Sequence, residues 1–165
     1  MTEISGFISI YIQSIKFALL DGKVKTIYVK SEDTDRKWYI IDAQDKVLGR
    51  LAQRVADVIR GKHKPSFHPS AECGDFVIVI NAGKVKVTGK KSTDKTYFWH
   101  TGFVGGIKSI TFDKLLAKDA TQVIMKAVKG MVPHNRLGRK LMSNVKVYVD
   151  DKHPHAAQQP LPLEI

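Results

Sequence analysis

The stretch WYIIDAQDKVLGRLAQRVADVIRG (Trp38–Gly61), followed later by DFVIVINA (Asp75–Ala82), decides the predicted fold. WYIID combines aromatic and β-branched residues in a short apolar run, which is typical of a strand. Apolar residues from Leu48 to Ile59 then recur at the spacing of one helix face, and Gly61 is suited to end that helix. The uninterrupted FVIVI indicates a strand buried on both faces. Strand, helix and buried strand form a βαβ unit, so we predict an α/β fold with a parallel sheet flanked by helices.

The rest of the chain predicts a further series of short elements. Three prolines and the lack of periodicity predict an extended tail from Asp150 onward. The expected elements before it are extended segments at 84–89 and 96–100, helices beginning at Phe112 and spanning 123–131 and 135–142, and a strand at 145–149.

Length and composition exclude several classes of protein. The 165 residues fit one domain, and 43% of them are apolar, which suffices for a hydrophobic core. Cys73 is the single cysteine, so the sequence excludes an internal disulfide and a cysteine-rich zinc module. The sequence has no run of about 18 uncharged apolar residues, so we expect no membrane span.

The chain carries a net charge of +11, which is unevenly distributed. Residues 1–35 hold four lysines against five acids, so the positive excess lies entirely in residues 36–165. Three basic clusters stand out, at 60–65, 84–95 and 126–140. Each alone is consistent with a solvated face. Three clusters in one small domain favour a polyanionic partner, with nucleic acid ahead of an anionic membrane.

The sequence offers no strong catalytic or metal motif. The glycines of TGFVGGIK (101–108) do not fit a phosphate-binding loop, because one residue separates the last glycine from Lys108. We expect these glycines to turn the backbone and to let it approach another surface closely, such as an RNA backbone. His63, His68 and Cys73 lack the paired spacing of a zinc site, so we predict no metal and no cofactor. We also predict that Cys73 has no functional role.

Two other groups of side chains allow more than one interpretation. Asp42 and Asp75 flank strands, where turn capping is commoner than paired catalytic carboxylates. Four aromatic or imidazole rings follow one another at 97–100, and side chains alternate along a strand. Two of these rings can therefore stack on bases or riboses, or all four can be buried between layers.

Five blocks of sequence follow one another almost without gaps: WYIIDAQDKVLGRLAQRVADVIRGKHK, GDFVIVINAGKVKVTGKK, HTGFVGGIK, AVKGMVPHNRLGR and HPHAAQQP. In this order they resemble the large-subunit ribosomal protein L thirteen family in its bacterial or organellar form. The resemblance covers about residues 25–165, with Val24 at the position of the usual start. The departures are residues 1–23 and Phe103.

This resemblance implies a three-layer α/β/α domain with a small, mainly parallel sheet. It implies a structural, early-assembling constituent of the large ribosomal subunit that binds its ribosomal RNA, supports translation and has no enzymatic activity. The expected partners are that RNA and neighbouring large-subunit proteins, with the chain present as a monomer on a cytoplasmic or organellar ribosome. We expect residues 1–24 to be an extension or a start-site artefact, residues 25–149 to form the domain, and residues 150–165 to form the tail.

The basic clusters supply the candidate RNA contacts, mainly to phosphates and 2′-hydroxyls. Arg136, Arg139 and Lys140 share one face of a short predicted helix, and no acid lies between Lys126 and Asp150, so we expect them to lack an internal partner. A basic α/β enzyme acting on a phosphorylated substrate and a regulator of messenger RNA are the alternatives. The candidate RNA-binding residues are Arg60, Lys62, His63, Lys64, Lys84, Lys86, Lys90, Lys91, Lys95, His100, Lys108, Lys129, Arg136, Arg139 and Lys140.

Overall fold

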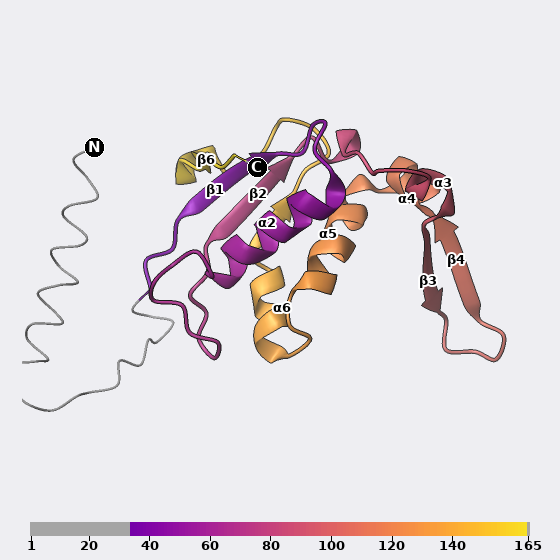
Figure 1. Cartoon of the computed structure of the whole chain (residues 1–165), viewed down its shortest axis with the longest axis horizontal. Helices are drawn as coiled ribbons and strands as arrows, with labels where there is room; N and C mark the ends of the chain where they lie inside the picture. The colour runs from indigo at the N-terminus through magenta and orange to yellow at the C-terminus, as the bar shows by residue number, and fades with distance from the viewer. Residues whose placement is uncertain (1–33, 165) are drawn as a thin grey trace, which may run out of the picture.

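A four-stranded parallel sheet forms the centre of the computed structural model, which describes residues 34–164 (Figure 1). The strands β1 (Trp38–Asp42), β2 (Phe76–Ile80), β5 (Val145–Val147) and β6 (Leu161–Pro162) lie in the order β5-β2-β1-β6. Every pairing in this sheet is parallel, which confirms the predicted α/β class. The expected extension at 1–24 lies outside the described residues.

Helix α2 (Leu48–Arg60) connects β1 to β2 and covers one face of the sheet. It ends at Gly61, whose φ of 81° is left-handed, as predicted for a glycine at this position. Helix α5 (Ala120–Met131) packs beside α2, and both bury their apolar faces in one core with alternate residues of β1 and β2. The apolar faces of these amphipathic helices therefore hold them against one face of the sheet, as expected for the predicted βαβ unit.

The tail covers the opposite face of the sheet. Trp38 and Phe76 are paired neighbours on β1 and β2, and their rings stack with centroids 4.5 Å apart. The ring of His155 lies 5.2 Å from that of Trp38, immediately before the 3₁₀ turn η3 (Ala156–Gln158). Aromatic stacking therefore holds the tail against the sheet before β6 joins its edge.

An antiparallel hairpin projects from this body (Figure 1). It consists of β3 (Thr96–His100), as predicted, and β4 (Ile107–Thr111), whose first two residues belong to the predicted glycine loop at 101–108. The turn between them does use glycine, because Gly102 and Gly105 have φ values of 93° and 71°. Short helices flank the hairpin, α3 (Lys91–Asp94) before it and α4 (Phe112–Lys118) after it.

Two segments complete the described chain. Residues 84–89 were expected to be extended, but the 3₁₀ turn η2 (Ala82–Lys84) occupies their start, and Lys86 forms only an isolated bridge with Val47. Helix α6 (Arg136–Met142) lies within the predicted bounds. A side chain at Gly138 would lie 1.7 Å from the carbonyl oxygen of Pro133, so glycine permits α6 to pack against the preceding loop.

Candidate nucleic-acid interface

The candidate cations divide according to whether a carboxylate of the chain itself reaches them. Asp75 is fully buried, and its Oδ1 accepts hydrogen bonds from the backbone N–H of Lys37 at 2.8 Å and from Lys64 Nζ at 2.6 Å. His63 Nε2 lies 3.0 Å from its Oδ2. A buried carboxylate needs such partners, because removing a charge from water is costly. Lys64 and His63 therefore contribute to the fold. The expected turn cap is present at Asp42, whose Oδ1 accepts a hydrogen bond from the backbone N–H of Gln44 at 2.9 Å, but not at Asp75, whose partners are distant in the sequence.

Glu72 is a second buried carboxylate with cationic partners. Its oxygens lie 3.2 Å from Arg36 and 2.8 Å from Lys140 Nζ, and one accepts a hydrogen bond from Asn144 at 2.9 Å. Burial alone would raise the pKa of Glu72, but the hydrogen bonds from Lys140 and Asn144 and the nearby positive charges together lower it. The prediction that Lys140 lacks an internal partner is wrong, because that partner lies far away in the sequence.

Three further candidates have weaker, exposed partners. Lys62 Nζ lies 3.5 Å from Asp57, and Lys86 Nζ lies 2.6 Å from Asp45. Exposed ion pairs of this kind contribute little, so these lysines remain available to another anion. Lys84 donates a hydrogen bond to Gln44 Oε1 at 3.3 Å and shares a hollow with two acids of the tail. This hollow is therefore a less cationic surface than the sequence cluster at 84–95 indicates.

The other candidates have no acidic partner in the described part of the chain. Each is exposed or half-buried, and each carries a charge or a ring nitrogen that can meet a phosphate. Within residues 34–164, no ion pair involves Arg60, Lys90, Lys91, Lys95, His100, Lys108, Lys129, Arg136 or Arg139.

Several of these cations gather around α5. Tyr97 at the base of the hairpin lies between the candidate Lys95 and a further lysine of α5, with Lys95 Nζ 5.3 Å and Lys126 Nζ 5.1 Å from its ring centroid. These are cation–π distances, and burial raises the pKa of Tyr97, so the ring is a neutral phenol. Tyr97 thus joins the lysines that precede the hairpin to those of α5.

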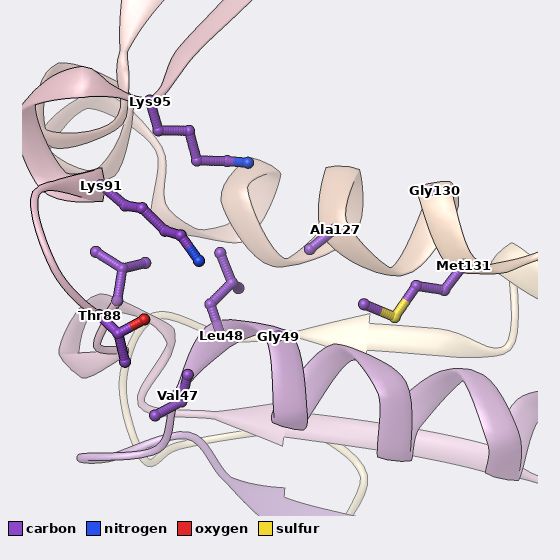
Figure 2. Close-up of a pocket in the computed structure, with 10 residues that line it drawn as sticks. Val47, Leu48, Gly49, Thr88, Lys91, Lys95, Ala127, Gly130 and Met131 are labelled. Carbon is purple, nitrogen blue, oxygen red and sulfur yellow. The ribbon is translucent and has the colours of Figure 1, made fainter.

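A pocket of about 380 Å³ lies on one side of α5, between that helix, α3 and the start of α2 (Figure 2). Figure 2 shows the side chains of Lys91 and Lys95 extending toward α5 and the first turn of α2. The residue before that turn, Val47, provides no side-chain cap. The positive end of the α2 dipole therefore adds to the two lysine charges.

A groove of about 280 Å³ lies on the other side of α5, toward α6. Lys126, Lys129 and Arg139 all line it, beside two methionines and Gln122. Lys126 is absent from the sequence-based candidates, although its place one helical turn before Lys129 was a signal for it. We call the set Lys91, Lys95, Lys126, Lys129 and Arg139 the α5 cationic surface.

Lys90 immediately precedes Lys91 at the start of α3, whereas other remaining candidates lie apart from this surface. Arg60 is at the end of α2, with its guanidinium 5.7 Å from the ring of Phe67. Lys108 and His100 are on the hairpin, where His100 Nδ1 accepts a hydrogen bond from the backbone N–H of Gly102. The structure therefore brings part of the predicted set together, and it leaves these residues as separate contacts.

Among residues 34–164, no group of three or more His, Cys, Asp or Glu side chains is placed to hold a metal ion. Cys73 is buried and unpaired. Across the same residues, no helix has both the length and the apolar character to span a bilayer.

Comparison with known proteins gives a consistent assignment. Residues 36–154 match the model of the family described as ribosomal protein L13. The chain belongs to the ribosomal protein L13 family. Relatives named large ribosomal subunit protein uL13 include those of Symbiobacterium thermophilum (53% identical over 141 residues), Saccharophagus degradans (55% over 142) and Thermotoga petrophila (51% over 141). Each alignment covers 86% of this chain and respectively 99%, 100% and 95% of the relative. The resemblance to the L13 family seen in the sequence is thereby confirmed.

Proposed function

We propose that the α5 cationic surface is the principal contact of this chain with large-subunit ribosomal RNA. The chain is a structural, non-enzymatic constituent of the large ribosomal subunit, as membership of the L13 family implies. It therefore acts on the cytoplasmic ribosome with ribosomal RNA and neighbouring proteins as partners. The α/β body supplies the rigid scaffold on which the cations are held.

One observation carries the proposal. The five cations of the α5 cationic surface come from α3 and its C-terminal end, from α5 and from α6, and none has an ion pair within residues 34–164. Folded RNA brings phosphates of different segments close together, and cations held on one rigid surface reduce their repulsion. The cations form two groups, with Lys91 and Lys95 beside the start of α2 and Lys129 and Arg139 on the other side of α5. This arrangement suits contacts with the backbones of two RNA segments rather than one.

The predicted candidates outside this surface contribute in two different ways. Most are accessible for peripheral phosphate contacts, which position a protein on RNA without reading bases. These residues are Arg60, Lys62, Lys84, Lys86, Lys90, His100, Lys108 and Arg136. His63, Lys64 and Lys140 are held by buried carboxylates, so we propose that their main role is to stabilise the loop and α6 that border the interface.

Sedimentation tests this function directly. The tagged full chain should co-migrate with large subunits in a gradient at low salt, and a variant with Lys126, Lys129 and Arg139 replaced by Gln should shift toward the free fractions. Glutamine keeps the helix propensity and removes the charge. Migration away from large subunits, with messenger RNA, would favour a regulatory role instead. Thermal stabilisation by nucleotides, but not by RNA, would favour an enzyme acting on phosphorylated substrates.

A further inference from the structure

The hairpin of β3 and β4 projects from the body (Figure 1), and it exposes an aromatic ring on each of its two faces. Trp99 is 44% exposed, and Phe98, its neighbour in β3, is 68% exposed. Side chains alternate along a strand, so these two rings belong to opposite faces of the hairpin. The faces differ in the charges that surround each ring.

The face of Trp99 continues the α5 cationic surface. Trp99 is paired with Lys108 of β4, so the two side chains are cross-strand neighbours on this face. Tyr97, two residues earlier in β3, shares the face, and its ring lies 5.3 Å from Lys95 Nζ and 5.1 Å from Lys126 Nζ. Trp99 therefore lies beside one lysine and extends a surface that holds two others at its base.

The ring of Trp99 has no stacking partner in the described part of the chain. No aromatic ring, lysine or arginine of residues 34–164 stacks on it. Trp38, the other tryptophan of the chain, instead stacks on Phe76 within the body. An indole is a large, rigid ring that loses little conformational entropy when a partner covers it. Trp99 thus offers an accessible ring beside positive charges.

An exposed ring next to lysines suits an unpaired RNA nucleotide. Unpaired bases of loops and bulges stack on aromatic side chains, and their phosphates are attracted to nearby cations. Lysine is depleted in protein–protein interfaces, so the lysines around Trp99 favour RNA over a neighbouring protein. The opposite face, with Phe98, carries no lysine or arginine on either strand.

We propose that Trp99 is a stacking platform for an unpaired base of large-subunit ribosomal RNA, with Lys108 contacting a phosphate of the same segment. The inference deepens the proposed function and rests on it, because the α5 cationic surface holds the RNA next to the hairpin. It adds contact with a base to an interface otherwise built on phosphate contacts. Stacking accepts every base, so Trp99 selects an unpaired nucleotide rather than a particular sequence.

Affinity for protein-free large-subunit ribosomal RNA tests the role of the ring. In the full chain, Trp99→Leu should weaken binding by about fivefold or more, whereas Trp99→Phe keeps a ring and should bind within about twofold of the unaltered chain. Phe98→Leu is the matched control, because it removes an exposed ring from the opposite face of the same strand, and it should have little effect. Neither leucine variant should change the melting temperature appreciably, since both rings are exposed.

Tryptophan fluorescence provides a signature of the stacking itself. Trp38→Phe keeps a ring against Phe76 and leaves Trp99 as the single tryptophan of the chain. Protein-free large-subunit ribosomal RNA should then quench the emission of Trp99. A fully paired RNA duplex, bound to saturation, should quench it far less, because its bases are already stacked on one another.

The outcomes separate this inference from the proposed function. Unchanged affinity of Trp99→Leu together with unquenched emission of Trp99 would overturn the stacking role, and so would a defect of that variant confined to incorporation into subunits, which would assign the face to a neighbouring protein. An equal loss of affinity in Phe98→Leu would overturn the assignment to one face. Stacking neutralises no phosphate, so Trp99→Leu should keep the salt dependence of RNA binding. Failure of the proposed function would appear instead as RNA binding that does not respond to loss of Lys126 and Lys129.

Discussion

Lys64 should contribute to folding far more than to RNA binding, although it lies in a basic cluster. Its side chain is 16% exposed, and its Nζ lies 2.6 Å both from Asp75 Oδ1 and from the carbonyl oxygen of Asp35. Lys64→Met retains most of the stem but leaves the buried Asp75 without its strongest cation. Breaking a buried pair in this way typically costs about 3–5 kcal/mol. His63, 3.0 Å from the other carboxylate oxygen, offsets part of this loss.

The net loss should be about 3 kcal/mol, a large fraction of the stability of a single domain. For a domain of this size it corresponds to a fall of roughly 10 °C in the melting temperature, measured by circular dichroism. Lys62→Met is the matched control, because Lys62 is half-exposed and 3.5 Å from Asp57, and its loss should cost less than about 0.5 kcal/mol.

A double variant separates the ion pair from the packing of the lysine stem. With Lys64→Met and Asp75→Asn together, no charge remains buried without its partner, so the double variant should be less destabilised than the sum of the single changes. The reasoning would be refuted if Lys64→Met melted within about 2 °C of the unaltered protein and lost RNA affinity instead.

Three further predictions concern other contacts. Burial raises the pKa of Glu72, but Lys140 helps to lower it below its ordinary value. The ionised carboxylate therefore stabilises the fold above pH about 4.3, and this stabilisation is lost as the pH falls through the lower pKa of the folded state. Lys140→Met should make the free energy of unfolding, measured in urea melts, depend less on pH in this acidic range. Gly138→Ala should destabilise the protein by about 1–3 kcal/mol in thermal melts, because the added carbon would meet the carbonyl of Pro133, and an unchanged melting temperature would disprove this close approach. Cys73→Ser should leave assembly into large subunits intact at a modest stability cost, and loss of assembly by a well-folded protein would assign the thiol a role.

Local patterns in the sequence suffice for the central layers of the fold. Helix α2 follows from apolar residues repeated at helical spacing, and β2 follows from five apolar residues that no surface strand would carry in succession. Strand β4 was not predictable in the same way. Glycines and exposed side chains at 101–108 resemble a loop, and only pairing with β3 makes the last two residues of that segment the start of a strand.

The division of the cations could not be predicted from the sequence because it depends on long-range contacts. Glu72 meets Asn144, which is 72 positions away, and Lys140 reaches the same carboxylate from α6. A count of neighbouring charges therefore makes Lys140 look equivalent to Arg139. The structure places one against a buried acid and the other in the groove beside α5.

The salt dependence of binding to large-subunit ribosomal RNA tests the central claim most directly. If about six phosphates are neutralised, a plot of log K against log salt concentration should have a slope of roughly −4 to −5. Lys126→Gln with Lys129→Gln should reduce the steepness by about 1.5 units. The melting temperature should fall only slightly, since neither lysine has an ion pair within residues 34–164 and the contact of Lys126 with the ring of Tyr97 contributes about 0.5–1 kcal/mol. A flat salt response, or an unchanged slope in the double variant, would contradict an RNA interface built on the α5 cationic surface.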